Sequence, residues 1–313
     1  MADPITNFPQ GSWVLVTGVT GFVASHIAKA FLDRGFKVRG TSRDLDRALW
    51  LIKDVLKDFA ARGDFELSEV ADLADDHAFD EAIKGVSAIV HVASIVTFDP
   101  DPNTVIPKTV AGATSILEAA TREQSVKAFV YTSYIGAVTM PRPGNDTQPP
   151  GHHPYEPSRG MLTYMAKERK PHFTINSVPP SAIMGEALNK VHNEGTGAWI
   201  RNLYDGDTSF WGPHGANYGV DVKDVAVLHV AAALEPEVNN ARLQAWGHKC
   251  NGNDVLEIMR KHYPEHRFVD DMDNQTVLTF SALLKKWANQ DGWKPLEQTV
   301  VENVDSILKL NND

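Results

Sequence analysis

Short apolar segments alternate with segments of helical periodicity through the first half of the chain. The short segments are rich in apolar or β-branched residues and lie at 12–17, 36–41, 65–70, 86–93 and 126–133, and a further strand is predicted in the second half, at 173–178. The helical segments between them lie at 22–34, 44–61, 76–84 and 104–123. This alternation is typical of β-α-β units, so it predicts an α/β fold with a doubly wound parallel sheet.

A glycine-containing turn, TGVTGFVA at 17–24, joins the first predicted strand to the first predicted helix. Gly18 permits a tight turn, Gly21 lets the backbone approach a pyrophosphate, and Ala24 is small enough for the helix to pack closely against the strand. The N–H groups of the first helical turn and the helix dipole then face the anion. A tight turn without a ligand is the alternative. We favour a dinucleotide site of the Rossmann type, formed by Gly18, Thr20, Gly21, Phe22 and Val23.

The second half of the chain is less regular. Residues 141–157 are dense in proline, glycine and short polar residues and predict a long surface loop. Residues 185–218 are also polar. Helical patterns return at 220–233, near 252–263, near 279–288 and near 295–310.

The loss of regular alternation between strand and helix patterns in the second half of the chain predicts two domains. The first is a Rossmann domain of residues 10–183 plus about 218–245. The second is a smaller α+β C-terminal substrate lobe of residues 184–217 plus about 246–313. Ligands of such proteins tend to bind in a crevice at the sheet edge or at a domain boundary.

Composition narrows the class of partner. The 313 residues carry a formal net charge of −10 and the pI is about 5.6, which argues against nucleic acid or an anionic membrane as main partner. The single cysteine, Cys250, allows no disulfide framework or cysteine-rich metal site. The first residues lack the basic and apolar regions of a signal peptide, and the apolar run at 86–98 is too short to span a bilayer. We expect a cytoplasmic monomer or homodimer without a metal.

The residues after the second predicted strand indicate which dinucleotide is bound. An acidic residue there holds the ribose hydroxyl of NAD, whereas an arginine accommodates the 2′-phosphate of NADP. Here the tip of the strand is GTSR at 40–43, so Arg43 stands at this position, and Arg47 follows one helical turn later. Asp44 is expected to be the N-cap of the next helix. We therefore predict NADP, the alternative being a solvated helix start in which Arg43 and Arg47 pair with Asp44 and Asp46.

Six motifs in order resemble those of the extended short-chain dehydrogenase/reductases. They are TGVTGFVASH (17–26), VRGTSR (38–43), ADL (71–73), HVAS (91–94), TS (132–133) and VDVKDVA (220–226). The resemblance covers roughly residues 10–310 and is greatest to the dihydroflavonol and cinnamoyl-CoA reductase branch and to the fungal NADPH-dependent aldehyde and ketone reductases. It implies that Asp72 and Leu73 flank the adenine and that Ala93 lines the ribose and nicotinamide side. Pro180 matches a residue that packs near the nicotinamide, and His91 is expected to be structural.

The resemblance also implies a reaction. In the family, a hydride passes from NADPH to a carbonyl carbon while a tyrosine gives a proton to the carbonyl oxygen. A lysine four residues later lowers the pKa of that tyrosine. Tyr164, in MLTYMA (161–166), matches the tyrosine. The position four residues later is Glu168, so the candidate lysine is Lys167, three residues on.

The segment after Tyr164 is short for the family. Only residues 165–172 separate it from the next predicted strand, and eight helical residues span about 12 Å, whereas strands run roughly 17–20 Å. Either Tyr164 keeps its place with a shortened crossover, or a helix over about 158–170 fills the crossover and moves Tyr164 away. The family pattern fits best if about thirteen residues are absent after Ala166.

The expected catalytic serine is also replaced. The family usually has Thr-Ser-Ser at the end of the fifth strand, and its second serine hydrogen-bonds the carbonyl oxygen. Here Thr132 and Ser133 are followed by Tyr134, which occupies that second position. Ser133 is the other candidate, although strand alternation points it to the opposite face.

Three functions remain after this comparison. The first is an NADPH-dependent reductase of an aldehyde or ketone, a small-molecule carbonyl substrate, in which Tyr164 supplies the proton. The second is a non-catalytic NADP-binding protein, since the lysine and serine are off pattern. The third is a nucleotide-sugar epimerase or dehydratase, which ranks low because 185–218 offers only Arg201 for a diphosphate. The aromatic residues of the lobe suit either a pocket wall or core packing; they are Trp199, Phe210, Trp211 and Tyr218.

Overall fold

A computed structural model describes residues 6–94, 101–137, 170–211, 216–272 and 293–312, which form two compact units. In the described part of the chain, the first unit comprises residues 6–94, 101–133, 170–178 and 229–243. The second unit comprises residues 134–137, 179–211, 216–228, 244–272 and 293–312. Among the described residues, no helix is both long and apolar enough to cross a lipid bilayer.

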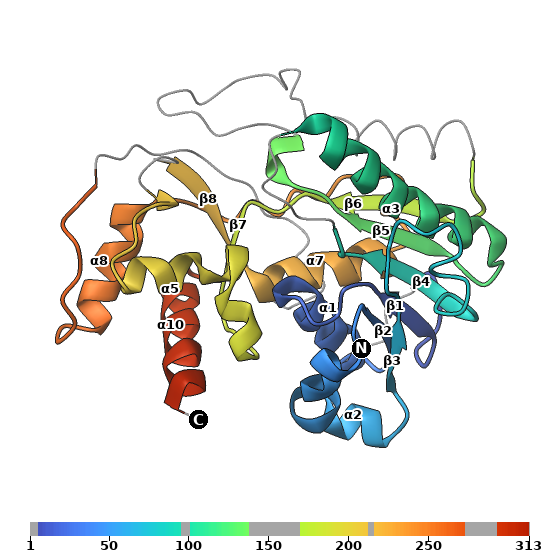
Figure 1. Ribbon diagram of the computed structural model, residues 1–313, viewed down its shortest axis with the longest axis horizontal. Coiled ribbons are helices and arrows are strands. Elements are labelled where there is room, and N and C mark those ends of the chain that lie inside the picture. The colour runs from blue at the N-terminus through green and yellow to red at the C-terminus, as the bar shows by residue number, and fades with distance from the viewer. Residues whose placement is uncertain (1–5, 95–100, 138–169, 212–215, 273–292, 313) are drawn as a thin grey trace. The chain divides into compact units, whose positions relative to one another are not determined.

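The first unit is built on a six-stranded parallel sheet with the order β3-β2-β1-β4-β5-β6 (Figure 1). Its strands are β1 Trp13–Val16, β2 Lys37–Ser42, β3 Phe65–Glu69, β4 Val86–His91, β5 Ala128–Thr132 and β6 Thr174–Val178. The strand order reverses direction between β1 and β4, which is where ligands bind in open α/β sheets. The predicted doubly wound parallel sheet is confirmed.

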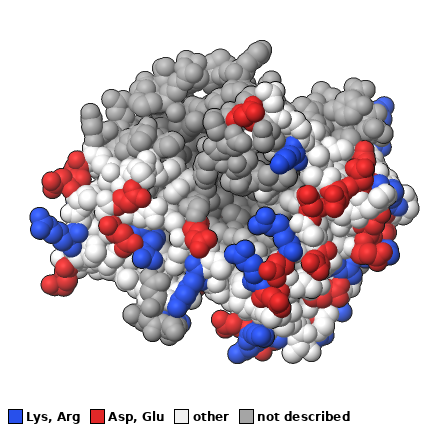
Figure 2. Space-filling view, in the orientation of Figure 1, with Lys and Arg blue, Asp and Glu red and all other residues white. Residues whose placement is uncertain are grey.

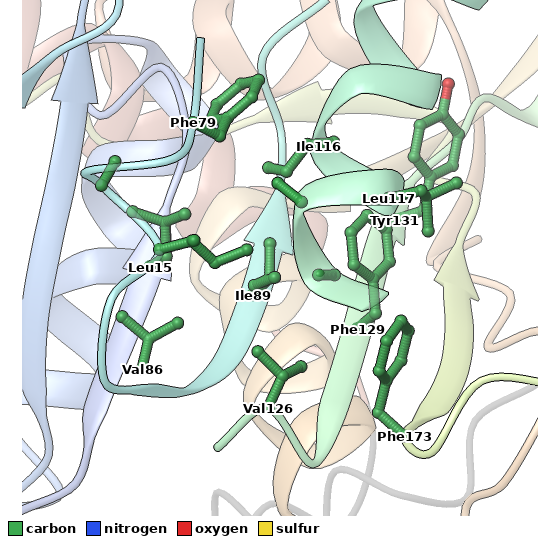
Figure 3. Close-up of a cluster of buried hydrophobic side chains, with 14 of the residues drawn as sticks. Leu15, Phe79, Val86, Ile89, Ile116, Leu117, Val126, Phe129, Tyr131 and Phe173 are labelled. Carbon is green, nitrogen blue, oxygen red and sulfur yellow. The ribbon is translucent and has the colours of Figure 1, made fainter. Parts of the chain in front are cut away.

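Helices cover both faces of this sheet. Helix α3 (Pro102–Arg122) lies on one face, and α1 (Phe22–Leu32) lies on the other (Figure 1). Strand alternation turns one set of side chains toward α3, where they form the core shown in Figure 3 with residues of that helix. The fully buried members include Leu15, Ile89 and Phe129 from the strands and Ile116 and Leu117 from α3.

Two predicted helices differ from the structure. The segment predicted as one helix at 44–61 is divided into a 3₁₀ helix (Asp46–Ala48), a π-helical turn (Leu51–Val55) and the short α2 (Lys57–Ala61). The helix predicted at 76–84 is a series of turns, with backbone bonds from Ala78 to Asp75 and from Asp80 to His77. Short acidic side chains favour turns over helix interiors, and apolar periodicity alone did not reveal this.

Helix α7 (Val222–Leu234) is buried rather than amphipathic. The sequence predicts an amphipathic helix at 220–233, but every residue from 224 to 234 is buried. Residues 222–228 belong to the second unit and residues 229–234 to the first. The predicted domains place this helix entirely in the Rossmann domain.

The second unit has a three-stranded sheet in the order β7-β8-β9, formed by Ala182–Met184, Ala216–Asp221 and His248–Asn251. Strands β7 and β8 are parallel, and β8 and β9 are antiparallel. Its main helices are α5 (Trp199–Tyr204), α8 (Gly252–His262) and α10 (Leu296–Asn312). Asn251 begins α8 with a capping box, since its side chain accepts from Asp254 N–H while the Asp254 carboxylate accepts from the Asn251 N–H.

The aromatic residues of this unit pack against one another. The rings of Trp199 and Phe210 stack with centroids 3.6 Å apart, and Trp211 meets Phe210 edge-on at 5.2 Å. Trp211 is buried, and its indole N–H donates to the Trp199 carbonyl at 3.2 Å. Tyr218 is buried against Trp246. These contacts favour core packing over a pocket wall.

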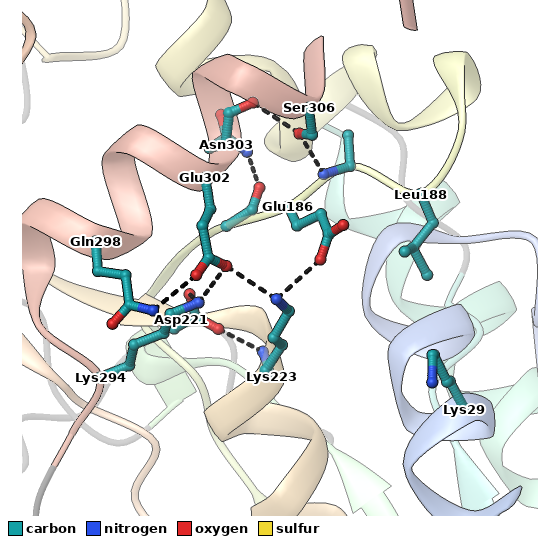
Figure 4. Close-up of polar contacts among 12 residues, drawn as sticks. Lys29, Glu186, Leu188, Asp221, Lys223, Lys294, Gln298, Glu302, Asn303 and Ser306 are labelled. Carbon is teal, nitrogen blue, oxygen red and sulfur yellow. Dashed lines mark hydrogen bonds and ion pairs between the residues drawn. The ribbon is translucent and has the colours of Figure 1, made fainter. Parts of the chain in front are cut away.

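A charged network joins α10 to the start of α7 (Figure 4). Lys294, only 7% exposed, pairs with Asp221 at 3.2 Å and with Glu302. Lys223 bridges Glu186 at 2.8 Å and Glu302 at 2.9 Å. The two lysines lower the pKa of Glu302 to about 2, against its burial. Opposite charges therefore fix the N-terminal part of α10 against β8 and α7.

Asp224 makes this network pH-dependent. Burial, together with nearby Asp221, raises the pKa of Asp224 to about 6, although its carboxylate accepts the Lys294 N–H at 2.8 Å. A folded-state pKa above the unfolded value near 4 means that protonation favours the fold, so this group's contribution to stability rises as pH falls from about 6 to about 4. We expect Asp224→Asn to flatten that part of the melting temperature profile. The exposed variant Asp33→Asn should keep the wild-type profile, and an unchanged profile in Asp224→Asn would refute the assignment.

Candidate nucleotide-binding site

The glycine turn has the geometry of a phosphate cradle. Gly18 adopts φ +65°, a left-handed conformation that favours glycine. A Cβ at Gly18 would lie 3.1 Å from the Cβ of Ala93, so a side chain would also crowd the end of β4. The Gly21 N–H donates to the Gly18 carbonyl at 2.9 Å and closes the turn. Helix α1 begins immediately afterwards, at Phe22.

The N-terminus of α1 is open to an anion. Its N-cap is the exposed Gly21, which no described side chain caps, and no acidic residue stands in its first turn. Around it lie Thr20, Phe22 and Val23, each partly exposed. An uncapped helix start presents N–H groups and the positive end of the helix dipole. The residues present therefore fit a dinucleotide pyrophosphate.

A buried threonine fixes this turn to the end of β4. The Thr17 hydroxyl accepts the N–H groups of Val92 and Ala93, each at 3.0 Å, and lies 3.0 Å from His91 Nδ1. Because these two N–H groups occupy both lone pairs of the hydroxyl, its single proton is the group left to face Nδ1. We therefore assign the hydroxyl as donor to Nδ1, with the proton of the His91 ring on Nε2. Complete burial lowers the pKa of His91 to about 4, so the ring is neutral near pH 7. His91 thus has a structural place, while the role of Thr17 was missed by the sequence reasoning.

Strand β2 supports the turn from the other side. The Gly18 N–H donates to the Thr41 hydroxyl at 3.1 Å, and the Val19 N–H donates to the Thr41 carbonyl at 2.9 Å. A Cβ at Gly40 would come within 2.6 Å of the Val19 side chain. Gly40 therefore allows the turn to pack closely on β2. A glycine inside a strand, where it has no side chain to pack, was the available sequence signal.

The two arginines after β2 are exposed. The Asp44 carboxylate accepts the N–H groups of Asp46 at 2.9 Å and Arg47 at 3.3 Å, although the N-cap of this 3₁₀ helix is Leu45 rather than the predicted Asp44. Within the described part of the chain, Arg43 and Arg47 form no ion pair. On the face drawn in Figure 2, basic and acidic side chains are interspersed over the described residues. The alternative to the NADP prediction, in which these arginines pair with Asp44 and Asp46, is not formed.

The remaining predicted cofactor residues lie at the same sheet edge. Gly18, Arg43, Asp72 and Ala93 follow the carboxyl ends of β1, β2, β3 and β4 respectively. Asp72 is exposed, and its carboxylate accepts the Ala74 N–H at 2.9 Å. Leu73 packs against the core beneath α3. Four adjacent parallel strands therefore bring these predicted cofactor residues to one edge of the sheet.

The predicted catalytic residues are only partly described. Tyr164 and Lys167 lie outside the described residues. Ser133 follows β5 in the first unit, and its N–H donates to the Val178 carbonyl at 2.9 Å. Tyr134 begins the second unit and is 50% exposed. Pro180, also in the second unit, is buried and accepts the Ile135 N–H at 2.9 Å.

The sheet order and the open helix start define a dinucleotide-binding protein of the Rossmann class. Residues 14–244 match the NAD dependent epimerase/dehydratase family, and the chain belongs to that family.

Individual relatives are similar over almost the whole chain. The NAD-dependent epimerase/dehydratase terH of Aspergillus terreus is 34% identical and aligns with 95% of this chain and 97% of its own length. Aldehyde reductase 2 of Sporidiobolus salmonicolor is 30% identical and aligns with 95% of this chain and 96% of its own length. Among solved structures, yeast methylglyoxal/isovaleraldehyde reductase Gre2 complexed with NADPH superposes with a TM-score of 0.80 at 21% identity. The superposition covers 96% of this chain and 99% of the Gre2 chain.

The alignments also show that this chain lacks residues. They extend over 335 positions for terH and 342 for aldehyde reductase 2, more than the 313 residues present here. Each relative therefore has residues without a counterpart in this chain. The absence predicted after Ala166 falls outside the described residues.

Proposed function

We propose that this protein is an NADPH-dependent reductase of an aldehyde or ketone. The observation that carries the proposal is the start of α1 behind Gly18 and Gly21, which no side chain caps among the described residues, with Arg43 and Arg47, which form no ion pair there, at the same sheet edge. An aldehyde reductase that is 30% identical over 95% of the chain supports the reaction class. The NADPH in the Gre2 complex supports the choice of cofactor.

The chain's own residues have distinct parts in this proposal. The α1 N–H groups bind the pyrophosphate, and Arg43 and Arg47 bind the 2′-phosphate. NADPH, when bound, supplies the hydride for the carbonyl carbon. Tyr164 donates a proton to the carbonyl oxygen, with Lys167 as the nearest cation in sequence. Ser133 or the exposed Tyr134 hydroxyl donates a hydrogen bond to that oxygen.

We also assign the substrate lobe to the second unit and the cofactor to the first. We further propose a cytoplasmic monomer or homodimer, and the cytoplasmic location accords with the chemistry of the single cysteine. Cys250 is a free, buried cysteine, and burial raises the pKa of its thiol to about 12. Such a thiol is unreactive and suits a protein that needs no disulfide.

Turnover tests the proposed reaction. Purified protein should oxidise NADPH in the presence of some members of a panel of aldehydes, ketones and β-keto esters, and not in their absence. Binding of NADPH without oxidation by any of these substrates would remove the reductase assignment and leave the nucleotide site intact.

The arginine pair predicts the coenzyme preference. Replacing Arg43 and Arg47 together by alanine should weaken NADPH binding about 10- to 100-fold, because charge-assisted hydrogen bonds to the 2′-phosphate are lost. Affinity for NADH, which lacks that phosphate, should change less than about twofold. Fluorescence titration measures both, and Lys53→Ala serves as a control for loss of an exposed cation nearby. Equal losses for both coenzymes would contradict the assignment.

Two other functions have specific support. Glu168 at the lysine position and Tyr134 at the serine position favour a non-catalytic NADP-binding protein. The similarity to terH, named an epimerase/dehydratase, favours a reaction of that class. Arg201, the arginine available to a nucleotide-sugar diphosphate, pairs with Asp205 one helical turn away. Because Arg201 is already paired with Asp205, we rank an epimerase reaction below carbonyl reduction.

A further inference from the structure

We infer that His229 is a positioning residue for the carboxyl end of β5, the segment that delivers Ser133. Its link to catalysis rests on the proposed function, whereas its effect on the strand does not. His229 lies in the part of α7 that belongs to the first unit, is 0% exposed, and has its Nε2 2.8 Å from the Thr132 hydroxyl. Thr132 is the last residue of β5.

The surroundings make this contact unusual. From Val225 to Leu234, α7 is buried throughout, and His229 is the one ionisable residue in an otherwise apolar run. An apolar side chain of similar size would satisfy packing alone. A buried polar pair adds little net stability over such a residue, but it restricts the arrangement of the two elements. We therefore expect the His229–Thr132 pair to fix the position of α7 relative to β5 rather than to stabilise the fold.

A second polar contact fixes the position of α7 on the same face of the sheet. Asn176 of β6 is buried, and its amide donates to the Ala232 carbonyl of α7 at 2.7 Å. Ala232 is three residues after His229, so both lie on one side of the helix. Asn176 pairs with Val130 across the sheet, two residues before Thr132, which places both contacts on one sheet face. The helix is thus attached to β5 and β6 at two points.

These contacts fix the main chain that leads to Ser133 in two directions. The His229–Thr132 contact holds the end of β5 perpendicular to the sheet. The bond from the Ser133 N–H to the Val178 carbonyl, 2.9 Å, holds it within the sheet. If the His229–Thr132 contact is lost, the main chain at the end of β5 becomes more mobile at Thr132, one residue before Ser133. Within the described residues His229 bonds to Thr132, and it acts on Ser133 through the strand.

The test uses near-isosteric pairs. Thr132→Val removes the hydroxyl and keeps the shape, whereas Thr132→Ser keeps the hydroxyl. His229→Leu removes the ring nitrogen, whereas the amide of His229→Gln reaches the position of Nε2. Thr132→Val is the safest of these for folding, because Thr132 is partly exposed. Hydrogen exchange of peptides spanning 128–135, kcat, the KM for NADPH and thermal unfolding are measured for each.

We expect Thr132→Val and His229→Leu to speed exchange at 128–135 about tenfold and to lower kcat about tenfold, with the KM for NADPH changed less than twofold. Thr132→Ser and His229→Gln should stay near wild type, and the double variant should be no worse than either single one. Unchanged exchange in Thr132→Val, or Thr132→Ser as impaired as Thr132→Val, would overturn the inference. If wild type shows no turnover, the proposed function fails, and the exchange data alone decide the role of His229.

Discussion

Replacing Gly21 by aspartate should abolish NADPH binding without weakening the fold. Gly21 is the N-cap of α1, and a carboxylate there would take the N–H groups that we assign to the pyrophosphate. It would also place a negative charge where the phosphates bind. The same charge favours the helix by a few tenths to about 1 kcal/mol, because it meets the positive end of the helix dipole. We expect at least a hundredfold loss of affinity, about 2.7 kcal/mol, with a melting temperature equal to or above wild type.

Two further variants separate charge from shape. A Cβ at Gly21 would lie 3.2 Å from the Gly18 carbonyl oxygen, a tight contact that Gly21→Ala isolates. Gly21→Asn caps the helix without a charge. The losses should rise from alanine through asparagine to aspartate, as measured by NADPH fluorescence titration. An aspartate variant that binds NADPH as tightly as wild type would show that the dinucleotide does not use this helix start.

Replacing Tyr164 by phenylalanine should have the largest effect on rate. General acid catalysis by a positioned side chain contributes about 100- to 10,000-fold, so kcat should fall within that range. The cofactor should still bind, because the pyrophosphate and 2′-phosphate contacts lie elsewhere. Steady-state kinetics and NADPH titration of the same preparation measure the two effects.

Tyr134→Phe is the matched control for Tyr164→Phe, since it removes a phenol hydroxyl of equal size. If Tyr134 only donates a hydrogen bond to the carbonyl oxygen, its loss should cost about tenfold in kcat. A larger loss for Tyr134→Phe than for Tyr164→Phe would transfer the proton-donating role to Tyr134. No loss of rate for Tyr164→Phe would contradict its assignment.

Sequence patterns predicted those parts of the molecule that depend on local chemistry. The parallel sheet follows from short β-branched segments between helical ones, and the cradle follows from Gly18 and Gly21 at the end of an apolar strand. Asp44 was predicted to bond to the backbone at the start of its helix, and its side chain does so, although Leu45 is the N-cap. The contacts that form the cradle and the Asp44 bonds span only a few residues, and each strand and helix of the sheet is indicated by its own local periodicity.

Long-range contacts explain what the sequence could not predict. The Thr17 hydroxyl meets residues at the end of β4, more than seventy positions away, and Lys294 meets Asp221 at a similar separation. The predicted helix at 76–84 was wrong because its apolar spacing suits both a helix and a series of turns packed on the core. Likewise, the full burial of α7 depends on what surrounds it rather than on its own periodicity.

The central claim, hydride transfer from a bound NADPH, is tested most directly by isotope transfer. Wild-type protein is incubated with a reducible carbonyl compound and NADPH that carries deuterium at the transferred position of the nicotinamide, and the alcohol product is analysed by mass spectrometry. We predict one deuterium on the carbinol carbon, and none with Gly21→Asp under the same conditions. Binding of the labelled NADPH without any deuterated alcohol across the substrate panel would contradict the account and favour a non-catalytic NADP-binding protein.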